Sequence, residues 1–128
     1  MTDTITLKRQ FPVSAETLYN AWLSGEEHSN MTGGGAECSD VVDGPFSIWD
    51  GYITGKNLLL APFSKIVQTW RSSDFLETDS DSEIEVLFKN NDAGCELTLT
   101  HKIIPVGQPD YEKGWEDHYF TPMREYFG

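Results

Sequence analysis

Residues 111–127 read YEKGWEDHYFTPMREYF, and this segment decides the fold. Its aromatic and apolar residues recur at helical spacing, so that most of them fall on one side of a helix. That side comprises Tyr111, Trp115, Tyr119, Pro122, Met123 and Tyr126, widened by Phe120 and Phe127. Pro122 has no backbone N–H, which predicts a kink near Thr121 or a new first turn there. A helix with so broad an apolar side must pack on a large apolar surface.

The strands that precede this helix are the only candidates for that surface. Polar and apolar residues alternate before and after the turn signals Asp43-Gly44 and Asp50-Gly51. The pattern predicts strands at 4–10, 38–42, 46–49, 52–60, 65–71, 84–89 and 95–104. Their short connections favour antiparallel pairing, because parallel strands need long crossovers.

Two short helices are predicted between the first strand and the others. Ser14 is a suitable N-cap for a helix over 15–23, and Gly25 ends it before a second helical segment at 26–30. The chain is therefore expected to form a single α+β domain over residues 1–128. In that domain a curved antiparallel sheet of six to seven strands packs around a long C-terminal helix.

Composition excludes several classes of function. The 128 residues contain 9 Lys and Arg against 21 Asp and Glu, a net charge of −12. Such a chain is not expected to bind nucleic acid or an anionic membrane, because both need a basic surface. The N-terminus shows no secretory leader, so we expect a cytoplasmic protein. Cys38 and Cys95 lack metal-ligand spacing and are expected to stay reduced and unbridged.

Four segments carry motifs that occur together in one known family. Residues 42–55 contain a hairpin of the form G-x-F-x-x-x-D-G-x-x-x-G, and residues 66–71 contain I-V-x-x-W-R. Residues 97–105 form a strand that ends in Pro, and residues 114–127 begin with Gly-Trp and end with Tyr-Phe. In this order the motifs resemble the heat-shock protein 90 ATPase activator-like family. The resemblance implies the helix-grip fold of the START-like (SRPBCC) superfamily.

His101 is the residue most suited to chemistry. Alternation through Leu97, Leu99, His101 and Ile103 places its ring on the side of the sheet that faces the helix. It could bind a ligand or transfer a proton, or it could be a buried histidine that is hydrogen-bonded to a neighbouring residue. If His101 has a partner on the last helix, Glu112 and Glu116 are the candidates, and a carboxylate there would raise the pKa of His101. The alternative is that both glutamates lie on the flank of an amphipathic helix.

Further residues are expected to line the space between helix and sheet. Gln68 shares a face with Trp70, so its amide is either a structural hydrogen-bonding group or a polar contact in an apolar pocket. Trp115 and Tyr119 approach from the helix. The candidate ligand-binding residues are His101, Gln68, Trp70, Glu112, Trp115, Glu116 and Tyr119. We expect no cofactor and no metal site, because the histidines have no ligand spacing and the acidic run 77–83 does not fit a calcium loop.

Three functions agree with these features. The first is a non-enzymatic, monomeric binding domain that holds a small hydrophobic molecule in an apolar cavity between helix and sheet. The second follows from the resemblance and is a chaperone-regulating interaction domain, whose acidic surface would attract a basic partner. The third is catalysis of the cyclase or aldol type known on this superfold, by His101 with Glu112 or Glu116.

Overall fold

The computed structural model describes residues 2–49, 51–105 and 110–127. Its strands form one antiparallel sheet in the order β1-β7-β6-β5-β4-β3-β2. The strands are β1 (Thr2–Phe11), β2 (Ala36–Glu37), β3 (Pro45–Ile48), β4 (Ile53–Ala61), β5 (Lys65–Ser72), β6 (Ser82–Asn91) and β7 (Gly94–Pro105). The helices are α1 (Ala15–Leu23), α2 (Gly25–Thr32), α3 (Tyr111–Trp115), the π-helical turn η1 (Glu116–Phe120) and α4 (Thr121–Phe127). This is the helix-grip fold that the sequence predicts.

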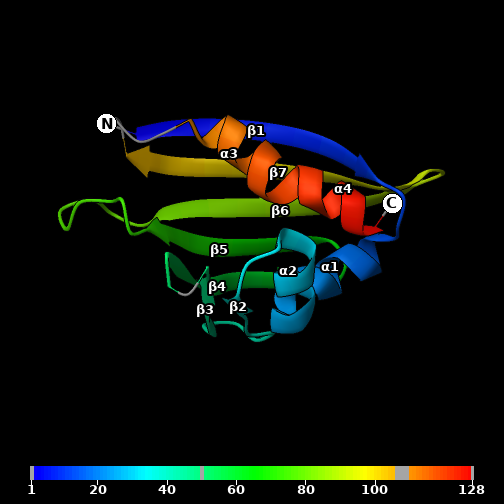
Figure 1. Cartoon of the computed structure of the whole chain (residues 1–128), viewed down its shortest axis with the longest axis horizontal. Coiled ribbons are helices and arrows are strands. Elements are labelled where there is room, and N and C mark those ends of the chain that lie inside the picture. Colours follow the sequence, from blue (N-terminus) through cyan, green and yellow to red (C-terminus); the bar gives the residue numbers. More distant parts are fainter. Residues whose placement is uncertain (1, 50, 106–109, 128) are drawn as a thin grey trace.

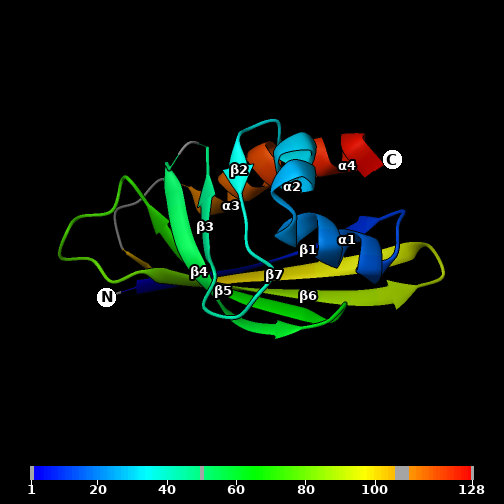
Figure 2. The ribbon, with the colours of Figure 1, turned by 90° about the horizontal axis from the view of Figure 1, so that it is seen from below.

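The described helices all lie on one side of the sheet. The C-terminal helical run crosses β1, β7 and β6, and α1 and α2 cover the strands beside it (Figure 1). Seen from below, the opposite side of the sheet is bare of helices (Figure 2). The core therefore lies in a single layer between the sheet and the helices. Its largest fully buried side chains are Phe11, Leu18, Trp22, Met31, Ile48, Ile66, Ile84, Leu97, Leu99, Tyr119, Phe120 and Met123.

Only one predicted strand is wrong. Residues 38–42 form a loop, and β2 instead pairs Ala36 with Ile48 and Glu37 with Ser47. The amide of Asn57 explains the loop, because its Nδ2 donates hydrogen bonds to the carbonyl oxygens of Ser39 and Val41. These carbonyl groups are thereby satisfied without a strand partner.

The C-terminal helix contains the predicted irregularity. Its middle is the π-helical turn η1, in which the N–H of Thr121 reaches back to the carbonyl of Glu116. Pro122 lies directly after this turn and cannot donate to the carbonyl four residues earlier. A wider turn at this point is a known way to accommodate such a break, and α4 then begins at Thr121.

The inward face of β7 is as predicted up to His101. Leu97, Leu99 and His101 are completely buried. Ile103 differs, because the pairing of β1 with β7 shifts by one residue near this point, and Ile103 adopts a positive φ of 61°. This bulge turns Ile103 outward, where 38% of its surface is exposed, and brings Ile104 into the core instead.

Both cysteines are free thiols in the structure, as expected. Cys95 is fully buried on β7, whereas Cys38 is partly exposed in the loop after β2, at the far edge of the sheet. Asp50, the first residue of the predicted turn signal Asp50-Gly51, lies outside the described residues. No described helix has the length and apolar character needed to cross a membrane.

Gly55 on β4 is predicted to tolerate no side chain. An added Cβ would lie 2.1 Å from the carbonyl oxygen of Thr69 and 2.7 Å from the ring of Phe46. Gly55→Ala should therefore lower the free energy of unfolding by about 1–3 kcal/mol, which urea denaturation measures. Gly114→Ala is the matched control, because nothing lies within 4 Å of its added Cβ. In its helix that change should instead stabilise by about 0.5–1 kcal/mol. Equal effects of the two changes would contradict this packing.

Candidate functional site

An open cleft lies between the start of the C-terminal helix and the adjoining ends of β4 and β5. Its volume is about 680 Å³, within the range of small-molecule sites. Six aromatic side chains line it, namely Trp49, Tyr52, Trp70, Tyr111, Trp115 and Tyr119. The remaining lining residues are Ile53, Ser72, Asp74, Asp110, Lys113, Gly114, Asp117 and His118. The cleft is thus an aromatic hollow with charged residues among its lining.

A chain of buried hydrogen bonds holds the helix side of this cleft to the sheet. The indole Nε1 of Trp115 donates to Nδ1 of His101 over 3.1 Å. The other ring nitrogen of His101, Nε2, lies 2.7 Å from Oγ of Ser82. The hydroxyl of Ser82 in turn donates its own proton to the carbonyl oxygen of Trp70. Because Nδ1 accepts a hydrogen bond, the neutral ring carries its proton on Nε2 and donates it to Ser82.

A second polar chain lies behind the cleft and involves Gln68. Nε1 of Trp22 donates to Oε1 of Gln68 over 3.1 Å, and Nε2 of Gln68 donates to Oδ1 of Asn57 over 2.8 Å. Asn57 then binds the loop after β2. Oε1 and Nε2 of Gln68 both have partners within the protein, so Gln68 is a structural hydrogen-bonding group here. It ties α1, β5 and β4 together.

His28 of α2 forms a third buried contact with the helix. Its Nδ1 lies 2.8 Å from the carbonyl oxygen of Trp22, and its Nε2 lies 2.6 Å from the hydroxyl of Tyr119. Since a carbonyl can only accept, Nδ1 carries the proton and Nε2 accepts from the tyrosine. Tyr119 is 1% exposed, and burial raises the pKa of its phenol, with a further contribution from Cys38.

Burial keeps both histidines neutral. Desolvation lowers the pKa of His101 from 6.5 to about 3. Desolvation also lowers the pKa of His28 to about 4, although its hydrogen bond to the backbone of Trp22 opposes this shift. A protonated His101 would turn Nδ1 into a donor that faces the donor of Trp115. The neutral form is therefore a condition for the bond that holds the helix.

The structure brings some of the predicted site residues together and separates others. Trp70, Trp115 and Tyr119 line the cleft. His101 and Gln68 are buried behind these rings and make no part of the cleft wall.

Glu112 and Glu116 do not meet the expectation of a carboxylate beside His101. Glu116 instead forms ion pairs of 2.8 Å with Arg9 and with Arg124. Glu112 is exposed and borders a smaller hollow beside β1. The residue that reaches His101 from the helix is Trp115, so the proposed His–Glu acid/base pair is wrong.

Sequence reasoning missed several cleft residues. Trp49 is only partly buried, adopts a positive φ of 54° and lines the cleft. An added Cβ on Gly34 would lie 1.9 Å from its indole ring, so the run of three glycines allows the loop to pack on Trp49. Tyr52 and Asp74 meet through a hydrogen bond across two loops, for which the sequence has no local signal.

No group of three or more His, Cys, Asp or Glu within 2–49, 51–105 and 110–127 is arranged to hold a metal ion. The acidic run 77–83 instead borders the loop around Arg71. The guanidinium of Arg71 donates to the carbonyl oxygens of Leu76 and Asp79 and pairs with Asp81. Within this run the carboxylate of Asp81 thus pairs with Arg71, and that of Glu83 lies 3.8 Å from Nζ of Lys102.

The comparisons with known proteins agree with this fold and with the motifs. The family model described as "Activator of Hsp90 ATPase homolog 1-like protein" matches residues 12–128. The chain belongs to this family. The human activator of 90 kDa heat shock protein ATPase homolog 1 is 29% identical over 125 residues, which are 97% of this chain and 37% of that protein. An uncharacterised protein of Schizosaccharomyces pombe is 30% identical over 119 residues, 92% of this chain and 35% of its own length.

The chain thus spans about a third of the length of these curated relatives. A solved structure of similar size also matches, that of an HSP90 activator from Plasmodium falciparum. Its TM-score is 0.83 at 26% identity, and the match covers 98% of this chain and 95% of that one. The solution structure of an Aha1 dimer from Colwellia psychrerythraea matches at a TM-score of 0.77 and 13% identity over 98% of this chain and 93% of that one, which supports the fold alone.

Stability is predicted to fall with mild acid. In the unfolded chain His28 and His101 bind protons below pH 6.5. In the folded chain His28 binds a proton only below about pH 4, and His101 only below about pH 3. Folded pKa values below the unfolded ones mean that this stability is fully present above pH 6.5 and is lost as the pH falls towards the folded pKa values. From about pH 7.5 to about pH 5.5 we expect a loss of about 2.7 kcal/mol in urea denaturation, half from each histidine.

The variant His28→Gln provides the matched comparison for this effect, because an amide does not titrate. It should lose only about half as much stability over the same pH interval. An unfolding free energy of the unaltered chain that stays constant from about pH 7.5 to about pH 5.5 would show that the two histidines are not held neutral.

Proposed function

We propose that this domain regulates a heat-shock protein 90-type chaperone by binding to it and raising its ATPase rate. The observation that carries the proposal is the match to a solved structure of nearly the same length that is named as an HSP90 activator. A family match over residues 12–128 supports it as well. In this role we expect the chain to act as a monomer in the cytoplasm, where it would meet the chaperone.

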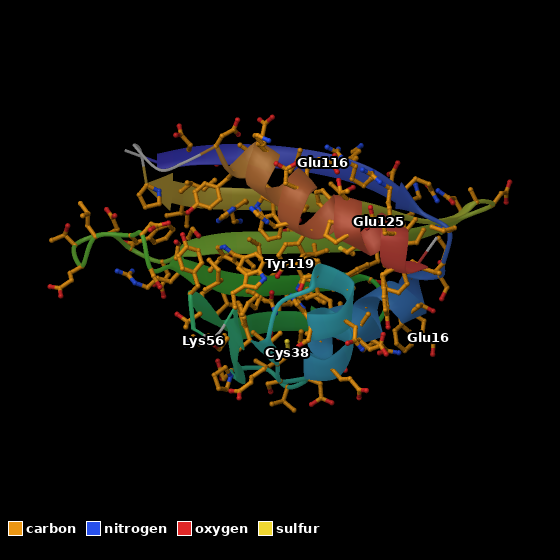
Figure 3. All side chains as sticks on the ribbon, viewed as in Figure 1. Glu16, Cys38, Lys56, Glu116, Tyr119 and Glu125 are labelled. Atoms are coloured by element: carbon orange, nitrogen blue, oxygen red, sulfur yellow. The ribbon has the colours of Figure 1, made fainter. Side chains whose placement is uncertain are left out.

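The distribution of charge over this chain favours a partner with a basic surface patch. The outer face of the sheet, which no helix covers, carries Lys8, Lys56, Lys65, Lys89 and Lys102 with Glu83, Glu85 and Glu96. Among the described strand residues, three glutamates therefore lie on that face beside five lysines. Glu16 on α1 and Glu125 on α4 are exposed on the helix side (Figure 3). A basic partner is attracted to the helix side.

The test is the ATPase rate of a purified heat-shock protein 90 titrated with this chain. We expect a saturable rise in the rate. The double variant Glu16→Lys with Glu125→Lys should raise the half-maximal concentration by about three- to tenfold at low salt, because it removes attraction on the helix side. Added salt should likewise raise the half-maximal concentration of the unaltered chain.

Glu77→Lys with Asp92→Lys is the matched control for that variant. It changes the net charge by the same amount, at exposed positions in the β5–β6 and β6–β7 loops instead of on a helix. This control should leave the half-maximal concentration close to that of the unaltered chain. No rise in the ATPase rate at any concentration of the chain would overturn the proposal. Equal weakening by both double variants would leave the activation but refute the helix side as the docking face.

A second function is favoured by the cleft, namely the binding of a small, largely apolar molecule between helix and sheet. The aromatic lining and the volume of about 680 Å³ support it. In this proposal Trp70, Trp115 and Tyr119 contact the ligand, and His101 and Gln68 hold the walls from behind.

Native mass spectrometry of the protein isolated gently from its own cells tests this second function. We expect the chain to carry the added mass of a small molecule, lower than that of a peptide chain. Denaturation should release this molecule. Trp49→Ala should abolish the added mass, because it removes a partly exposed ring from the cleft edge. An unchanged mass of the unaltered chain would contradict the ligand proposal and would leave the chaperone proposal intact.

A further inference from the structure

We propose that the cleft selects a compact organic cation, such as an alkylammonium or quaternary ammonium group, over a neutral molecule of the same shape. The proposal deepens the second function above and rests on it. It follows from two properties of the same lining: the number of aromatic rings and the sign of the charges around them.

The aromatic rings form a connected wall. The ring centroids of Trp70 and Trp115 lie 4.8 Å apart, and Tyr119 lies 4.8 Å from Trp115. Trp49 continues the wall at 5.8 Å from Tyr119. Aromatic side chains attract a cation by their quadrupole, and tryptophan is the most effective of them. Groups of such rings recur wherever proteins bind quaternary ammonium ions.

The charges in the lining have the sign that favours a cation. The cleft lining contains the side chains of Asp74, Asp110 and Asp117 and a single lysine, Lys113, so the formal charges of its aspartates and lysine sum to −2. Lys113 is held by Asp117 through an ion pair of 2.7 Å, and that contact raises the pKa of the lysine. Its ammonium is therefore directed to a carboxylate of its own helix. The whole chain adds to the effect with its charge of −12.

The carboxylates are also fixed in place by their own contacts. Asp74 accepts a hydrogen bond from the hydroxyl of Tyr52, which is part of the same lining. Asp110 is the N-cap of α3, where Oδ1 accepts from the backbone N–H of Lys113 over 3.2 Å. The aromatic wall is held equally firmly, because Trp115 is bonded to His101. A site that is arranged before binding loses less free energy in ordering its groups.

A pair of isosteric probes tests the selection. Choline carries a trimethylammonium group, and 3,3-dimethylbutan-1-ol carries a neutral tert-butyl group of the same shape. Binding is followed by the indole N–H signals of Trp49 and Trp115 in NMR spectra. We expect choline to bind at least about tenfold more tightly than the neutral alcohol, at equal ionic strength.

Asp110→Asn removes one charge and keeps the helix cap, because asparagine is an equally good N-cap. It should weaken the binding of choline by about threefold and leave the neutral alcohol unchanged. Asp92→Asn, in the exposed β6–β7 turn, makes the same change in net charge and should affect neither probe. Weakening by both variants to the same degree would overturn the local role of the cleft charges.

The outcomes separate this inference from the functions on which it rests. Equal binding of both probes would overturn cation selection and leave an apolar ligand cleft. No shift of either indole signal would overturn both, while the ATPase test of the chaperone proposal stays independent. A peptide with trimethyllysine is the third probe: tighter binding than choline would indicate a protein side chain as the source of the cation, and weaker binding would indicate a free small molecule.

Discussion

The hydrogen bond between the indole of Trp115 and Nδ1 of His101 joins the C-terminal helix to the centre of the sheet. Both partners are almost completely buried, so neither has water as an alternative partner. His101 passes the constraint on to Ser82, whose hydroxyl holds the backbone of Trp70. Trp70 and Trp115, which both line the cleft, are thus fixed by one chain of four groups. The cleft keeps its shape because this chain has a single satisfied arrangement.

Two further contacts extend the same constraint to the first helices. His28 binds the hydroxyl of Tyr119, one turn after Trp115, and Trp22 binds Gln68 on β5. Among the described residues no buried side-chain N or O atom lacks a hydrogen-bond partner. The polar atoms of the buried aromatic side chains are therefore hydrogen-bonded to other buried groups, and these bonds form a network through the core. Such a network fixes the rotation of the helix more strictly than apolar packing does, because a small rotation would leave several buried donors unsatisfied.

The sequence predicts the elements well because their periodicity is local. The inward positions of Leu97, Leu99 and His101 follow from strict alternation within one strand. The wrong elements depend on distant groups: residues 38–42 bond to the side chain of Asn57, and Ile103 is turned outward by a bulge against β1. No pattern within either segment contains that information.

The site was predictable to the same extent. Strand and helix periods predict which face Trp70, Trp115 and Tyr119 occupy, and all three line the cleft. The partner of His101 was not predicted, because the rotation of a helix on a sheet depends on which side chain satisfies a buried acceptor. Glu116 instead forms ion pairs with two arginines, Arg9 on the edge strand and Arg124 about two helical turns later. A carboxylate in place of Trp115 would have required burial of a charge.

The most direct test of this account is the protonation state of His101 measured by its ring nitrogen shifts in NMR. The account predicts a neutral ring that carries its proton on Nε2 and does not titrate between about pH 7.5 and about pH 5, because its pKa is lowered to about 3. A ring that is protonated on Nδ1, or one that titrates near its ordinary pKa of 6.5, would contradict the bond to Trp115 and the arrangement of the cleft that depends on it.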